Sequence, residues 1–100
     1  MTAYSVLFVT PTEDSWVPAY LAETGAVMKK HGGRYLARTG NHQQIEGADI
    51  PAGLRILIEW PSQQDALNFE NDPEYKPHLE ARLKGSTSYH FVFEGQDDLA

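Results

Sequence analysis

The chain of 100 residues contains no cysteine, and this absence excludes disulfide bonds, thiolate catalysis and cysteine-ligated zinc. Basic residues are also scarce, because 8 lysines and arginines stand against 14 aspartates and glutamates and leave a net charge of −6. Nucleic-acid binding rests on neutralising phosphates, so we expect no nucleic-acid partner. A chain without cysteine fits a reducing compartment, and we expect a cytoplasmic protein.

Long apolar runs are missing as well. The longest strictly apolar run extends only from Val6 to Val9, far short of the roughly 20 residues that span a bilayer. The N-terminus lacks the basic and then apolar build of a signal peptide, so we expect no membrane partner. We find no internal repeat and no linker. The sequence therefore predicts a single domain over residues 1–95, followed by an acidic tail over residues 96–100.

What is present is the composition of an ordinary globular domain, with 41% hydrophobic and 22% charged residues. Segments rich in β-branched and aromatic residues predict four strands, at residues 4–10, 34–39, 54–60 and 87–93. Residues 43–45 are a candidate extension of the second strand. A helix is expected from about residue 15 to residue 31, with Pro18 in its first turn and Gly32 and Gly33 ending it.

The segment between the third and fourth strands predicts two helical pieces. Ser62, followed three residues later by Asp65, resembles a capping box that opens the first piece. Asp72 as the N-cap and Pro73 as the first helical residue open the second piece. Its expected apolar stripe consists of Tyr75, Leu79 and Leu83.

The resulting order, β-α-β-β-α-β, predicts an α+β ferredoxin-like fold with a four-stranded antiparallel sheet and helices on one face. Alternation along the strands predicts the residues under the helices, namely Tyr4, Val6, Phe8, Leu54, Ile56, Ile58, Trp60, Tyr89, Phe91 and Phe93. The opposite face would carry Ser5, Leu7, Val9, Arg55, Leu57, Glu59, His90 and Val92. That face is too apolar for solvent, so we expect a homodimer in which two sheets meet face to face.

Three strings of residues make the sequence similar to a known family. They are His31-Gly32-Gly33-Arg34-Tyr35-Leu36-Ala37-Arg38, Ile58-Glu59-Trp60-Pro61-Ser62 and Asp72-Pro73-Glu74-Tyr75-Lys76-Pro77, and they resemble the family called domain of unknown function 1330. The resemblance runs from the first strand to Gly95. It implies a dimeric α+β barrel, a group that includes cofactor-free monooxygenases, isomerases and haem-handling enzymes alongside members without known chemistry.

The resemblance also implies a set of polar family positions, which here are Arg34, Arg38, Glu59, Tyr75 and Arg82. The chain departs from the family at Glu70, where an aromatic residue is frequent, and at Gly25, where proline is common. The departure at Glu70 puts in doubt any pocket chemistry that needs that ring.

Pairing the second and third strands gives a local hypothesis about charge. If Leu36 faces Leu57, then Arg34 faces Glu59 and Arg38 faces Arg55, because partner numbers in an antiparallel pair keep a constant sum. Arg38 and Arg55 could then hold a carboxylate or phosphate while Glu59 acts as a base. In the structural alternative, Glu59 neutralises one arginine, and an acidic residue such as Glu46 or one from the other subunit neutralises the other.

Aromatic residues between the helices and the sheet, among them Tyr20 and Tyr75, are either core or the wall of a cavity for a flat organic molecule. The candidate ligand-binding residues are therefore Arg34, Arg38, Arg55, Tyr20, Tyr75 and Arg82. The candidate catalytic residues are Glu59, His90 and Tyr75, with His90 placed on the dimer face near Glu59. The four histidines lie in separate elements, so we expect no metal site and no cofactor.

Two functions fit these residues. The first is a dimeric protein without catalysis of its own, which binds a small organic or anionic molecule or acts as an accessory. The second is a cofactor-independent enzyme, similar to a monooxygenase or an isomerase, that acts on a small organic substrate. We keep both, because one architecture hosts many chemistries.

Overall fold

Seven elements follow one another along the chain in the order β-α-β-β-α-α-β. The computed structural model describes all residues from 1 to 100. The strands are β1 (Ala3–Pro11), β2 (Arg34–Thr39), β3 (Leu54–Trp60) and β4 (Ser86–Glu94). The helices are α1 (Val17–Lys30), α2 (Gln63–Glu70) and α3 (Lys76–Lys84). The predicted element order is confirmed, and no helix is long and apolar enough to cross a bilayer.

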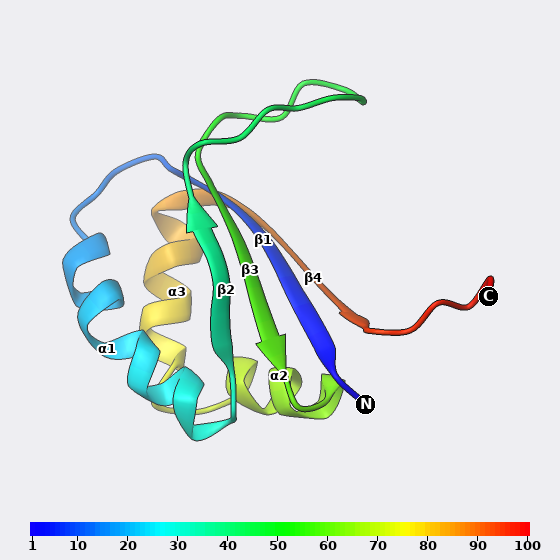
Figure 1. The fold of residues 1–100 in the computed structure, drawn as a ribbon. Coiled ribbons are helices and arrows are strands. Elements are labelled where there is room, and N and C mark those ends of the chain that lie inside the picture. The colour runs from blue at the N-terminus through cyan, green and yellow to red at the C-terminus, as the bar shows by residue number, and fades with distance from the viewer.

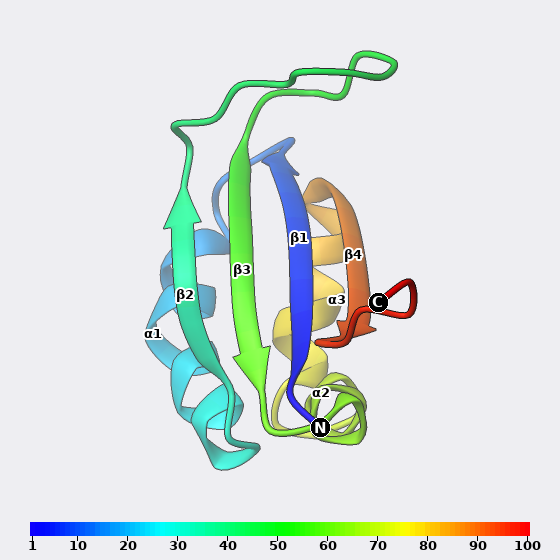
Figure 2. The ribbon, with the colours of Figure 1, turned by 45° about the vertical axis from the view of Figure 1, so that its right-hand side comes forward.

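The four strands form one antiparallel sheet in the order β2-β3-β1-β4. All three helices lie on the same side of this sheet (Figure 1), and the other side is left uncovered (Figure 2). We call these sides the covered face and the open face. The arrangement is the ferredoxin-like α+β fold that the element order predicts.

Local sequence explains where the first helix begins and ends. Pro18 lies in the first turn of α1, where a missing backbone N–H costs no hydrogen bond. After α1, Gly32 adopts a φ of +79°, in the left-handed region that favours glycine. A Cβ at Gly32 would also lie 2.6 Å from the ring of Pro61, so the turn requires glycine for two reasons.

The second helical region begins as predicted and then differs. Ser62 caps α2 by accepting a hydrogen bond from the backbone N–H of Asp65 at 3.1 Å. Asp72 does not cap α3, because that helix begins only at Lys76. Asp72 instead caps the turn before it, where its carboxylate accepts the backbone N–H of Glu74 at 2.8 Å. Asp72 is thus a cap, as predicted, but it caps the turn before α3 and not the helix itself.

The predicted assignment of side chains to the two faces is correct for β3 and wrong for β1 and β4. Leu7 and Val9 are buried on the covered face, while their neighbours Val6 and Phe8 point to the open face. In the ladder between β1 and β4, Val6 pairs with Phe91, so Phe91 shares the open face. Aromatic content misled the prediction, because it placed the largest rings under the helices.

The open face consequently carries most of the aromatic residues of β1 and β4. It consists of Tyr4, Val6, Phe8, Leu57, Tyr89, Phe91 and Phe93, together with Arg34, Ala37, Thr39, Arg55 and Glu59. The covered face holds Ser5 and His90 among its apolar residues. A sheet side without helices is thus the more aromatic of the two.

A β-bulge in β2 changes the predicted register of the edge strand. Arg34 pairs with Glu59, as expected, but the pairing shifts after Tyr35 and leaves Leu36 as the extra residue. Arg38 therefore pairs with Ile56 and not with Arg55. The predicted repulsion between two facing arginines is absent, because the bulge turns Arg38 to the covered face.

The core lies between the covered face and the helices. Phe69 of α2 is at its centre, with its ring stacked on Tyr75 at 4.1 Å and tilted against Trp60 at 5.2 Å. Leu79 packs against this cluster. Leu83 is 56% exposed, so the predicted apolar stripe does not include it. Arg82, one residue earlier, occupies the buried position.

The connection from β2 to β3 is irregular and carries no extension of β2 over residues 43–45. It projects beyond the end of the sheet (Figure 2). The Gln44 side chain holds its tip together, since its amide donates to the carbonyls of Glu46, Gly47 and Ala48. These side-chain hydrogen bonds of Gln44 are found where the sequence predicts an extension of the strand over residues 43–45.

Candidate functional site

A cavity of about 90 Å³ lies between the beginning of α1 and strands β1, β2 and β3. Most of its wall is apolar. The lining residues are Leu7, Val9, Pro11, Trp16, Val17, Tyr20, Leu21, Tyr35, Arg38, Leu54, Ile56, Ile58 and Arg82. Leu21 and Leu54 are exposed and mark its open side, whereas Arg82 is buried and marks its closed end.

Trp16 fixes the wall of the cavity at the beginning of α1. Its indole N–H donates to the carbonyl of Gly85 at 3.0 Å, which ties this helix to the junction of α3 and β4. The Tyr20 ring stands edge-on to Trp16 at 5.4 Å. A side chain at Gly85 would collide with the indole, so the contact depends on glycine there. These contacts hold the aromatic wall in one position.

Tyr20 and Tyr75 form a pair of hydroxyl groups at the buried side of the cavity. Their oxygen atoms are 2.7 Å apart. Burial raises the pKa of Tyr20 far above its usual range, and burial also raises the pKa of Tyr75. Both side chains are therefore neutral phenols. One hydroxyl donates to the other, so the second retains a free proton for a ligand.

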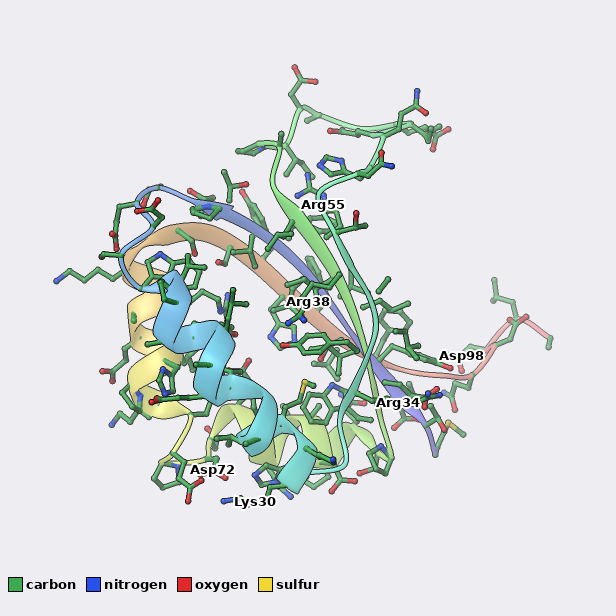
Figure 3. All side chains as sticks on the ribbon, turned by 60° about the vertical axis from the view of Figure 1, so that its left-hand side comes forward. Lys30, Arg34, Arg38, Arg55, Asp72 and Asp98 are labelled. Atoms are coloured by element: carbon green, nitrogen blue, oxygen red, sulfur yellow. The ribbon has the colours of Figure 1, made fainter.

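Arg38 reaches the cavity from the edge strand. Its guanidinium lies over the ring of Tyr35, 4.1 Å from the ring centre. Figure 3 shows Arg38 directed into the space between α1 and the sheet. In a regular strand, Tyr35 and Arg38 would point to opposite faces, because they are three residues apart. The bulge at Leu36 places both side chains on the covered face.

Arg82 is the buried charge of this site. The residue is 2% exposed, and its Nε and Nη1 atoms have no hydrogen-bond partner. No carboxylate forms an ion pair with it. Buried guanidinium groups are ordinarily paired, so an arginine in this state is unusual. The resemblance to the family pointed to this position, but only the structure shows that its charge is buried.

Three of the predicted site residues lie away from the cavity, on the open face. Arg34 donates from Nε to Glu59 Oε1 at 2.8 Å, in the ion pair that the strand register predicts. Arg55 lies over the ring of Phe8, 4.7 Å from its centre. The structure thus separates these three from Tyr20, Arg38 and Arg82, which it brings together at the cavity.

His90 lies on the covered face, and its predicted place on the open face beside Glu59 is wrong. Its Nδ1 atom is 2.9 Å from Glu70 Oε1, and its Nε2 atom is 2.9 Å from Ser5 Oγ. The indole N–H of Trp60 donates to the same Ser5 oxygen at 2.8 Å. A neutral imidazole protonated at Nδ1 satisfies the whole chain of hydrogen bonds.

Sequence reasoning missed this hydrogen-bonded network, which joins Ser5, Trp60, Glu70 and His90. Its order of serine, histidine and carboxylate matches that of hydrolase triads. Ser5 is 0% exposed, however, and does not line the cavity, so no substrate reaches its hydroxyl. The network therefore holds β1, β3, β4 and α2 together. No local motif signals it, because its members come from four separate elements.

The other histidines lie outside the cavity lining. His78 contacts Glu23 at 2.7 Å, and His31 contacts Asp72 at 2.7 Å. Lys30 joins the same Asp72 carboxylate at 2.8 Å. Figure 3 labels both residues. Hydrogen bonds from Lys30 and then from His31 hold the pKa of Asp72 well below its usual range. No group of three or more histidine, aspartate and glutamate side chains gathers into a metal-binding set.

The fold and the cavity define the class: a ferredoxin-like α+β protein with an apolar, arginine-containing cavity between its sheet and its first helix. The chain belongs to the family described as domain of unknown function (DUF1330), whose model matches residues 2–96. The family's activity is not assigned. A comparison with the curated proteins finds no match.

Solved structures share the fold. RPA0582 of Rhodopseudomonas palustris, a protein of unknown function, superposes with a TM-score of 0.78 at 16% identity, over 96% of this chain and 83% of that one. SnoaB of Streptomyces nogalater, a cofactor-independent oxygenase, gives 0.64 at 19% identity, over 98% and 96%. Rv0793 of Mycobacterium tuberculosis gives 0.54 at 14% identity, over the full length of both chains. At these identities the likeness shows the fold alone.

Proposed function

We propose that the protein binds a small, flat organic molecule in the cavity between α1 and the sheet. The observation that carries this proposal is the cavity itself, which is lined mainly by apolar and aromatic side chains and has a few polar groups at defined positions. Such a combination is typical of small-molecule sites. The solved structures of similar fold do not supply the ligand, so the proposal rests on the lining.

Binding accounts for the lining better than proton transfer does. An acid–base enzyme needs a group that exchanges protons near neutral pH. The lining contains tyrosine and arginine but no histidine or carboxylate, and burial raises the pKa of Tyr20 further from neutrality. The oxygenase activity named for SnoaB is therefore not part of the proposal. Glu59 and His90, the two candidate bases, lie outside the cavity.

The second part of the proposal is a homodimer through the open face. Phe91 is 60% exposed there, and Tyr89 and Phe93 are exposed beside it. A small domain rarely presents a continuous aromatic surface to water unless another surface covers it. A second copy of the chain offers the same surface, and pairing the two buries both at once. A cytoplasmic location completes the proposal and agrees with the lack of cysteine.

Native mass spectrometry of gently purified protein tests both parts together. We expect a dimer of twice 11.2 kDa that carries a reproducible extra mass. The substitution Ile56→Phe should fill the cavity and remove the extra mass while the dimer persists. Leu67→Phe, on the exposed side of α2, is the matched control and should retain it. A bare monomer would contradict the dimer, and an extra mass unaffected by Ile56→Phe would contradict the cavity.

A further inference from the structure

Arg82 is a charged side chain enclosed by protein, and two of its three guanidinium nitrogen atoms have no hydrogen-bond partner. It comes from α3, lines the closed end of the cavity and is 2% exposed. Its Nε and Nη1 atoms, which both carry N–H groups, find no acceptor in the protein. Arginine cannot give up its proton at ordinary pH, so the charge persists there. An acceptor supplied from outside the chain would complete this site.

The surroundings of Arg82 offer a further donor, and Glu70 is the carboxylate whose charge acts on it. Tyr20 lines the same cavity, and its hydroxyl pairs with that of Tyr75 at 2.7 Å, which leaves one phenolic proton free. The carboxylate of Glu70 makes its contact with His90 at 2.9 Å and forms no ion pair with Arg82. Donors therefore gather at one end of a cavity whose other walls are apolar.

The charge of these donors favours a carboxylate over a neutral group. The unpartnered Nε and Nη1 lie on different edges of the guanidinium, so each is free for a single charge-assisted hydrogen bond to an anionic oxygen such as that of a carboxylate. The aromatic and aliphatic walls require an apolar body attached to it. Arg38, near the open side, adds a second positive charge and favours an anion over a neutral molecule.

We propose that the cavity binds a flat aromatic carboxylic acid, with Arg82 holding its carboxylate and the free hydroxyl of the Tyr20–Tyr75 pair donating to it. This inference rests on the proposed function, because it names the class of ligand for the same cavity. It assigns Arg82 a role that its burial alone does not explain, since a core position would be filled more stably by an apolar side chain.

Two tryptophans make the test direct. Trp16 lines the cavity and Trp60 does not, so their two indole N–H signals in a ¹H–¹⁵N NMR spectrum provide a reporter and an internal reference. The wild-type protein is titrated with benzoate and cinnamate, and separately with the neutral benzamide and cinnamamide. We expect the Trp16 signal to move with every probe that binds, and each acid to bind at least about 10-fold more tightly than its amide.

Substitutions then identify which arginine binds the carboxylate. Arg82→Met retains the length of the side chain and should abolish the preference for acids while amide binding remains. Arg34→Met removes an arginine from the open face and should leave the preference unchanged. A preference lost in Arg38→Met but kept in Arg82→Met would overturn the assignment to Arg82.

The outcomes separate this inference from the proposed function. Equal binding of acids and amides by the wild-type protein would overturn the carboxylate proposal and leave the cavity proposal standing. A Trp16 signal that moves with none of the four probes would overturn the carboxylate proposal. The extra mass in native mass spectrometry decides the cavity proposal independently. Because the comparison of acids with amides uses the wild-type protein, it does not depend on whether Arg82→Met folds.

Discussion

The two faces of the sheet invert the usual distribution of polar and apolar side chains. The covered face encloses Ser5, His90 and, opposite it, Arg82, whereas the open face presents Phe91 and its aromatic neighbours to solvent. Burying polar groups is costly unless they are hydrogen-bonded, and exposing a broad apolar patch is uncommon. Both proposals address this inversion: a second copy of the chain would cover the open face, and an anionic ligand would supply acceptors for Arg82.

The largest effect is expected from a charge placed on the open face, because it tests whether a second copy of the chain covers that face. Phe91→Arg should convert the dimer into an 11.2 kDa monomer, because two buried guanidinium groups would face an apolar surface. Sedimentation velocity measures the change. Leu83→Arg is the matched control, since Leu83 is similarly exposed at 56% but lies on α3. A Phe91→Arg protein that sediments like the wild type would show that the open face is not the interface.

The next test concerns the polar network under the helices. Ser5→Ala should reduce the free energy of unfolding by about 1–3 kcal/mol, because the buried Trp60 N–H and the His90 ring both lose their partner. Urea denaturation measures the difference. Ser88→Ala, which breaks only a hydroxyl contact with Ser86, should cost about 0.5 kcal/mol or less. Equal effects of the two substitutions would mean that the network adds nothing to stability.

Asp72 tests how the helices are held over the covered face. Its folded-state pKa lies below the unfolded value of 3.8, so its stabilising effect is present above that pH and is lost as the pH falls through the folded pKa. We expect Asp72→Asn to lower the Tm at pH 7 on the order of 5 °C. The difference from the wild type should shrink as the carboxylate is protonated in acid. Thermal melts from pH 2 to pH 7 check this, and a difference that grows in acid would contradict it.

The smallest expected effect is that of removing the buried charge of Arg82, on the covered side of the sheet. Arg82→Met should raise the free energy of unfolding of the ligand-free protein by about 1 kcal/mol, because it removes a buried charge that forms no ion pair. Denaturation of protein stripped of ligand by refolding provides the measurement. A loss of more than about 2 kcal/mol would instead mean that Arg82 serves the stability of the fold.

Local signals in the sequence predicted most of the fold. Strand β3 and the Ser62 cap follow from patterns within a few residues, and so does the element order. The faces of β1 and β4 could not be assigned in the same way, because both alternating sets in these strands contain apolar residues and the larger ones are uncovered. Alternation identifies the two sets of side chains that lie on opposite faces of a strand. It does not tell which of the two sets the helices cover.

The candidate site shows the same division. Tyr20, Arg38 and Arg82 were among the predicted ligand-binding residues, and the structure brings them to one cavity. Arg34 and Arg55 were grouped with them because they have the same charge, although they lie on the other face. The relation of Ser5 to His90 joins residues 85 positions apart and leaves no signal in either neighbourhood. Side-chain chemistry can be read from a sequence, but which groups converge depends on register.

The single extra residue in β2 divides the pairing of this edge strand with β3 into two registers. Before Leu36 its partners are those of a regular ladder, and after it every side chain is displaced by one position. If Leu36 instead paired with Leu57 in a regular ladder, Arg38 would lie opposite Arg55 on the open face and the cavity would lose a positive charge. Deleting Leu36 would make the ladder regular and leave Arg38 opposite Ile56. Accommodating Leu36 as a bulge, and not the identity of residue 38, thus determines on which face of the sheet this arginine lies.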